Sequence, residues 1–194
     1  MTQDFTQHET VQNRLSKQAK AATENWIANC QHPLFGSLLF HSNAPINEHR
    51  RRKLLRLFFG KMDSLYFGNS ASRKNMRIPR HVGIHRGSNG DNLHAHFVIT
   101  PIGDTDQFCK IARLCWASLS NETYRYDDVK IEVARDQNDA ARYLLHENFR
   151  SGEYCPLLSA QSIAGQKIAA CNAELDFHQK NRIQRFVKKN EGHW

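Results

Sequence analysis

The sequence predicts an α+β domain in which helices cover one or both faces of a mostly antiparallel β-sheet. Several short segments alternate apolar and polar residues with the two-residue period of strands, and longer segments with helical spacing separate them. Turn residues join two of the strand segments directly, as in a β-hairpin. At 194 residues the chain is long enough for one domain with a substantial core, and short for two.

Residues 1–33 are expected to form a helical extension that lies against the outside of the domain. Leu15 and Trp26 belong to an apolar set that recurs among polar residues at roughly helical spacing, from about residue 7 to residue 29. The proline in the run 31–33 is expected to end this helix.

Residues 34–155 are expected to form the core. The apolar segment 34–40 is bounded by residues that break regular structure, which indicates a buried strand. A helix is predicted to begin near Pro45 and to end near residue 67, followed by a mobile basic loop at residues 68–76. The apolar stripe of this helix comprises Leu55, Phe58, Phe59, Met62 and Tyr66.

A β-hairpin is predicted next, because the alternating segments 80–85 and 93–99 flank a run of turn residues at 86–91. A helix follows from residue 104 or 105 to about 118, and then a strand at 129–134. The next helix is capped by Asn138 or Asp139 and runs to about 148. Residues 156–194 form a C-terminal extension, which contains a basic helix at 166–189. The core order strand-helix-strand-strand-helix-strand favours a ferredoxin-like or RRM-like central antiparallel sheet with flanking helices.

The charge of the chain favours a polyanionic partner. Lys and Arg number 27 against 19 Asp and Glu, which gives a formal charge of +8. A cluster of cations lies in the first turns of the second predicted helix: Arg50, Arg51, Arg52, Lys53 and Arg56. A solvated helix face is the simpler explanation of this cluster, and phosphate contact is the functional alternative. The expected nucleic-acid-binding residues are Arg50, Arg51, Arg52, Lys53, Arg73, Lys74, Arg77 and Arg86.

The cysteines and the apolar content indicate a cytoplasmic protein without a membrane partner. Five cysteines are scattered and never form a Cys-x-x-Cys pair, which is typical of a reducing compartment without a disulfide framework. The N-terminal residues have no apolar signal region, and no run approaches 18 apolar residues. The protein is therefore expected not to be secreted.

Histidines on the predicted hairpin indicate a metal site. Side chains alternate along a strand, so His94 and His96 point from the same face. Pairing of the two strands brings His85, or failing that His81, beside them. Three imidazoles would leave coordination positions for water or substrate. The simpler alternative is the half-exposed face of an ordinary sheet.

A His-hydrophobic-His strand, followed by a strand and a helix that carries Tyr143, resembles the HUH endonucleases over roughly residues 34–150. The tyrosine follows the histidine pair, as in the single-tyrosine replication-initiator branch of that superfamily. The resemblance implies that His94 and His96 bind a divalent metal, Mg²⁺ or Mn²⁺, that His85 occupies the place of a third ligand, and that Tyr143 is the nucleophile.

The implied activity is sequence-specific nicking and joining of single-stranded DNA through a 5′-phosphotyrosine intermediate. It would initiate rolling-circle replication of a plasmid, phage or other mobile element carried by a bacterium or virus. The expected partner is single-stranded or hairpin origin DNA. No Walker motif is present, so a helicase would have to act in trans.

The chain departs from the family pattern at two points. The common Tyr-x-x-Lys motif has His146 in place of the lysine, and we expect His146 to take over a catalytic role. Three histidine ligands are also softer than the oxygen ligands that Mg²⁺ prefers, which favours Mn²⁺ or another transition ion.

Four other functions remain as alternatives. A single-strand transposase belongs to the same superfamily. A non-catalytic RRM-like module would need exposed aromatic residues on central strands, but Phe97 is expected on the face opposite the histidines. A histidine-triad nucleotide hydrolase would need a third histidine where Val98 stands. A structural zinc site would more often combine histidine with cysteine.

Overall fold

A computed structural model of the chain describes residues 5–40, 48–85, 94–119, 128–146, 157–160 and 174–190. Side chains are described over residues 17–40, 49–85, 94–119, 128–146 and 174–190. The strands are β1 (Leu34–Leu39), β2 (Arg80–His85), β3 (His94–Ile99), β4 (Val129–Val133) and β5 (Leu157–Ala160). The helices are α1 (Phe5–Asn29), α2 (Glu48–Phe67), α3 (Asn69–Arg73), α4 (Thr105–Ala117), α5 (Gln137–Leu144) and α6 (Phe177–Asn190).

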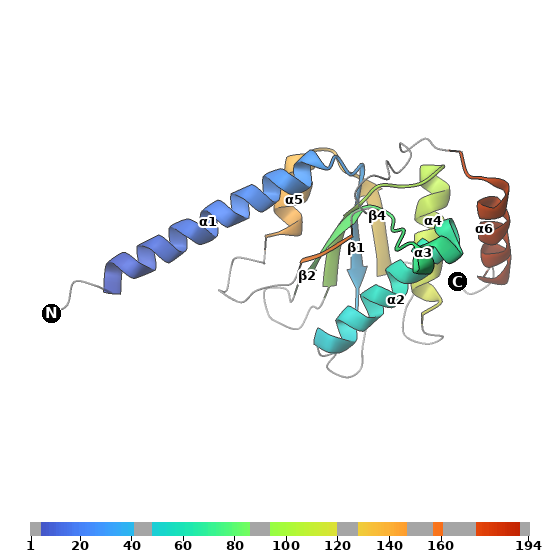
Figure 1. Ribbon diagram of the computed structural model, residues 1–194, viewed down its shortest axis with the longest axis horizontal. Helices are drawn as coiled ribbons and strands as arrows, with labels where there is room; N and C mark the ends of the chain where they lie inside the picture. The colour runs from blue at the N-terminus through green and yellow to red at the C-terminus, as the bar shows by residue number, and fades with distance from the viewer. Residues whose placement is uncertain are drawn as a thin grey trace.

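The strands form one antiparallel sheet in the order β4-β1-β3-β2-β5, with the His-x-His strand β3 at its centre (Figure 1). This confirms the predicted α+β class and antiparallel sheet. The predicted hairpin pairing also holds, because His85 lies opposite His94 and Gly83 lies opposite His96. Within the described ranges, no helix combines the length and the apolar character needed to cross a bilayer.

The two faces of the sheet have different coverings. The main core packs α2 and α4 against side chains such as Leu38, Ala95 and Phe97. A smaller cluster on the other face packs Ile27 of α1 and Leu144 of α5 against Val98 of β3. Figure 1 shows α2, α4 and α6 on one side of the sheet and α5 with the C-terminal end of α1 on the other. The β3 histidines share the face of Val98, and therefore lie beneath α1 and α5.

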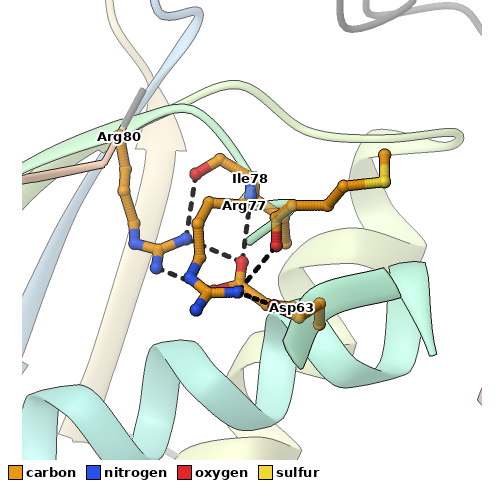
Figure 2. Close-up of polar contacts among 6 residues, drawn as sticks. Asp63, Arg77, Ile78 and Arg80 are labelled. Atoms are coloured by element: carbon orange, nitrogen blue, oxygen red, sulfur yellow. Dashed lines mark hydrogen bonds and ion pairs between the residues drawn. The ribbon is translucent and has the colours of Figure 1, made fainter. Parts of the chain in front are cut away.

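Helix α2 is anchored by its predicted apolar stripe and by a buried ion pair. All five residues of that stripe are buried, as expected. Arg80 of β2 donates from Nη1 to Asp63 Oδ1 at 2.8 Å and from Nη2 to Oδ2 at 2.9 Å (Figure 2). The backbone N–H of Ile78 donates to Oδ1 at 2.9 Å. These contacts hold α2 against the beginning of β2.

Helix α6 packs on the outside of α2 through the free carbonyl groups at the C-terminal end of α2. Arg182 donates to the carbonyl oxygens of Leu65 and Tyr66, each at 3.0 Å. A guanidinium is well suited to this position, because the C-terminal end of a helix carries partial negative charge. Gly68 follows with a φ of 55° and leaves room for the arginine, which lies 3.2 Å from the place of a Cβ atom.

Several predicted boundaries need correction. The segment expected to be a loop at 68–76 contains the short helix α3, and β5 was not expected. The caps proposed at Asn138 or Asp139 were wrong, because Asp136 caps α5 and accepts from the Asp139 backbone N–H at 2.8 Å. Helix α6 begins later than the predicted residue 166, and residues 161–173 lie outside the described part of the chain. The predicted turn at 86–91 also lies outside it.

Candidate active site

The three histidines expected to meet across the hairpin do lie together. The ring centroids are 5.3 Å apart for His85 and His94, 4.8 Å for His85 and His96, and 4.7 Å for His94 and His96. His81 lies on the same face but is paired with Val98, farther along the hairpin. Of the two β2 histidines considered, it is therefore His85 that joins the pair on β3.

Helix α5 places Tyr143 and His146 over these histidines. The Tyr143 ring lies 4.8 Å from the His96 ring, and the His146 ring stacks on His85 at 4.8 Å. Tyr143 and His146 are themselves stacked at 4.8 Å. The helix can approach so closely because the strand beneath its last turn carries Gly83, which has no side chain.

Ligand atoms of His85, His96 and His146 all lie within 4.8 Å of one another, which makes these three residues a group able to hold a metal ion. His94 lies beside the group and is half-buried. The structure thus places His146, expected to replace the family's lysine, among the candidate ligands. The sequence prediction had named His94 as the third residue of the set.

Hydrogen bonds orient two of these imidazoles with one nitrogen toward the group. His146 Nδ1 lies 2.6 Å from the carbonyl oxygen of Tyr143. A carbonyl only accepts, so Nδ1 carries the hydrogen, and in the neutral form of the ring Nε2 has a lone pair. His96 Nδ1 lies 2.8 Å from Ser37 Oγ, and its buried Nε2 has no hydrogen-bond partner among the described residues. Outer contacts of this kind orient metal-binding histidines.

The surroundings keep His96 uncharged. Burial lowers its pKa to about 2, and the neighbouring imidazoles of His85, His94 and His146 add to the effect. A neutral imidazole is the form that binds a metal, because its nitrogen lone pair is free. A buried nitrogen without a hydrogen-bond partner is costly, and a metal ion would remove that cost. The residues present therefore fit a divalent ion.

Tyr143 combines contact with the histidines and access to solvent, since its side chain is 54% exposed. A groove of about 450 Å³ is lined by Tyr143, by Phe35 and Ser37 of β1, and by residues at the end of β4 and the start of α5. Phe35 contacts the Tyr143 ring at 5.7 Å and the His96 ring at 5.4 Å. Ser37 and Phe35 were not expected at the site. They are two residues apart on β1 and therefore share one face of the strand, but the pairing register of β1 with β3 was needed to show that this is the histidine face.

The predicted nucleic-acid-binding residues differ in exposure. Arg50 and Lys53 are exposed and Arg52 is half-buried, whereas Arg51 is only 4% exposed. Leu39, at the end of β1, pairs with His94, and Figure 1 shows α2 beginning beyond this end of β1. The exposed cations at the start of α2 therefore lie toward the end of the strands at which His85 and His94 are paired.

The remaining predicted cations lie elsewhere. Arg73 and Lys74 are exposed at the end of α3. Arg77 contributes to the fold, because it donates to the carbonyl oxygens of Ala71 and Met76 and lies 3.6 Å from Asp63 Oδ2 (Figure 2). Arg86 lies outside the described residues.

No protein-family model, curated protein or solved structure matches the chain. The chemistry of the site must therefore be inferred from its own geometry. That geometry combines a set of imidazoles able to hold a metal ion, an exposed phenol in contact with one of them, and a groove that the phenol lines.

Proposed function

We propose that the protein is a metal-dependent endonuclease of the HUH type that cuts single-stranded DNA through Tyr143. One observation carries the proposal. The ring centroid of the exposed Tyr143 lies 4.8 Å from that of His96, and His96 belongs to a group of histidines able to hold a metal. The sheet order β4-β1-β3-β2 with β5 at the edge is compatible with the ferredoxin-like sheet of this superfamily. The central position of β3 also agrees with this assignment.

His85, His96 and His146 would hold the ion, with His94 beside them as a further candidate ligand. A divalent cation there would polarise the scissile phosphate and reduce the repulsion between that anion and an attacking oxygen. The nitrogen-rich set favours Mn²⁺ or a similar transition ion over Mg²⁺. The carbonyl of Tyr143 and the hydroxyl of Ser37 would keep two of the rings in their binding orientation.

Tyr143 would act as the nucleophile. Its hydroxyl loses a proton to solvent, which its exposure permits, and the oxygen attacks phosphorus to form a phosphotyrosine bond. The bond from phosphorus to the 3′ oxygen breaks, and that oxygen takes up a proton to leave a free 3′ hydroxyl. The covalent bond preserves the energy of the cut phosphodiester, so a later 3′ hydroxyl can reverse the step and join strands.

Single-stranded DNA is the substrate that best fits the surface. An unpaired base can stack on an aromatic ring, and Phe35 and Tyr143 both line the groove. The groove also contains Asp136 and Asp139, so a base rather than a phosphate is the better occupant. The phosphates would instead contact exposed cations such as Arg50 and Lys53, near the end of the strands that carries the histidines.

A non-catalytic RRM-like module fits less well. Such a module needs exposed aromatic residues on its central strands. Phe97, on the central strand, is only 1% exposed and contacts Phe58 and Phe59 of α2. On β1 and β3 this leaves only the half-buried Phe35 as an aromatic side chain that a base could reach. Between the two HUH biologies, we propose replication initiation, with a helicase in trans, because the tyrosine follows the histidine pair; single-strand transposition remains the alternative.

The decisive experiment is incubation of the protein with labelled single-stranded oligonucleotides and Mn²⁺, followed by a denaturing gel. We expect a protein-DNA adduct that disappears with a chelator or in Tyr143→Phe, while Asn138→Ala, an exposed change on the same helix, retains it. Tyr143→Phe should still bind DNA. An adduct that survives in Tyr143→Phe, or that maps to Tyr66, Tyr124, Tyr126 or Tyr154, would overturn the assignment.

A further inference from the structure

A second group of metal-binding side chains lies away from the candidate active site. The Sγ atom of Cys30 and ring nitrogens of His32 and His81 all lie within 4.8 Å of one another. These residues come from three segments: the chain just after α1, the connection to β1, and the beginning of β2. None of them belongs to the group formed by His85, His96 and His146.

His32 has the surroundings of a metal ligand. Its side chain is buried, with 3% exposure, and its Nδ1 lies 2.8 Å from the hydroxyl of Thr100. The backbone N–H of Thr100 in turn donates to the carbonyl of Pro79 at 3.0 Å, which holds this contact in place. His32 Nε2 is buried and has no hydrogen-bond partner among the described residues. A hydroxyl that accepts from Nδ1–H would leave a lone pair on Nε2, the tautomer that a metal requires.

His81 and Cys30 complete the group from two sides. His81 is fully buried, and its ring lies 5.1 Å from the ring of His32 and 4.6 Å from that of Trp26. Cys30 is half-buried, with Sγ 3.3 Å from the carbonyl oxygen of Trp26. Between Cys30 and His32, Gln31 has a φ of 51°, an uncommon conformation for a residue other than glycine. This turn lets Cys30 and His32 approach the same point.

The charge state of the imidazoles agrees with this role. Burial lowers the pKa of both His32 and His81 to about 4, and for His32 the proximity of His81 adds to the effect. Both rings are therefore neutral near pH 7, which is the form that donates a lone pair to a metal.

We propose that Cys30, His32 and His81 form a second metal site that binds Zn²⁺ through one thiolate and two imidazoles. Mixed sulfur and nitrogen ligands are those that Zn²⁺ prefers, and three protein ligands leave the fourth tetrahedral position to water. The half-buried Cys30 gives solvent a route to that position.

The site would join α1 to the sheet. Figure 1 shows α1 extending away from the domain, with its C-terminal end near the sheet. An ion bound by residues just after α1 and at the start of β2 would fix the direction in which this helix leaves. The second site needs no nuclease activity, so its test is independent of the proposed function.

Co²⁺ provides a specific probe, because a thiolate ligand produces a near-ultraviolet charge-transfer band that imidazoles alone do not produce. In metal-free protein titrated with Co²⁺, we expect this band to rise to saturation and to disappear in Cys30→Ser. It should remain in Cys109→Ser, which alters a half-buried cysteine on α4, and in His85→Ala, which alters the other site. Absence of the band in the wild type, or its persistence in Cys30→Ser, overturns the proposal.

A second measurement uses the unmodified protein and does not depend on the folding of a variant. Zn²⁺ should slow the alkylation of Cys30 by iodoacetamide and leave the rate of alkylation of Cys109 unchanged. Peptide mass spectrometry measures both rates. Equal alkylation of Cys30 with and without Zn²⁺ would also overturn the proposal. Thr100→Val removes the outer contact of His32 and should weaken Zn²⁺ binding about 10- to 100-fold while the cobalt band persists.

Discussion

Gly83 of β2 lies directly beneath the carbonyl group of Leu144 at the end of α5. A Cβ atom at residue 83 would lie 2.6 Å from that oxygen and 2.9 Å from His85 Nε2, closer than real Cβ atoms approach such groups. The absence of a side chain at this one position therefore allows the end of α5 to rest on the strand. Tyr143 directly precedes Leu144 and His146 follows it by two residues, so the same contact brings both residues to the histidines of the sheet.

Gly83→Ala should separate the tyrosine from the metal ligands without unfolding the protein. Because the nearest neighbour is the backbone carbonyl of Leu144, the last turn of α5 must move outward, and the His85 ring must shift as well. A displacement of about 1 Å is expected to reduce the cleavage rate about 100-fold. Single-turnover cleavage measures the effect. Gly60→Ala is the control, because nothing lies within 4 Å of a Cβ atom there; equal rates in both variants would contradict the role of Gly83.

The metal ligands can be distinguished by Mn²⁺ affinity. His96→Ala and His146→Ala each remove a nitrogen of the three-histidine group and should abolish tight binding. His94→Ala, which removes a ring beside the group, should weaken binding less. Binding is measured from the electron paramagnetic resonance signal of free Mn²⁺. The Cys30→Ser background removes a ligand of the second proposed site, so that the signal reports the three-histidine group alone. If His94→Ala proved as severe as His96→Ala and His146→Ala had no effect, the ligand set predicted from the sequence would be the right one.

The buried Asp63–Arg80 pair should be essential for stability. Asp63→Ala leaves the buried guanidinium of Arg80 without its carboxylate, and breaking such a pair costs about 3–5 kcal/mol. Urea denaturation gives the free energy of unfolding. Asp139→Ala, which breaks an exposed pair with Arg142, should cost no more than about 1 kcal/mol. Similar losses in the two variants would mean that solvent reaches the Asp63 pair.

DNA binding should depend steeply on salt between about 50 and 200 mM, because bound cations release counterions from the phosphates. Arg50→Ala and Lys53→Ala should each reduce the slope of log K against log salt by about 0.7, the value for one contact with single-stranded DNA. Fluorescence anisotropy with a labelled oligonucleotide gives the slope. Lys188→Ala tests in the same way whether α6, which packs on the outside of α2, contacts the DNA. An unchanged slope in the first two variants would exclude the start of α2 from the interface.

The sequence by itself determined the local features of the site. Alternation along β3 was enough to place His94 and His96 on one face, because side-chain direction in a strand depends only on residue spacing. Alternation along β2 likewise placed His81 and His85 together, and the pairing of the two strands then selected His85. The stripe of α2, with Phe58 and Met62 among its members, followed in the same way from helical periodicity. Such predictions need no knowledge of which distant segments meet.

Only the tertiary structure decided which of these side chains lie together. His146 joins His85 and His96 because Gly83 admits the end of α5, and no local pattern encodes a close approach between segments some 60 residues apart in the chain. The contact of Ser37 with His96 required the register of β1 on β3. Cys30, His32 and His81 likewise meet only because the end of α1 packs beside the start of β2. Periodicity reports which way a side chain points, whereas long-range packing determines what it meets.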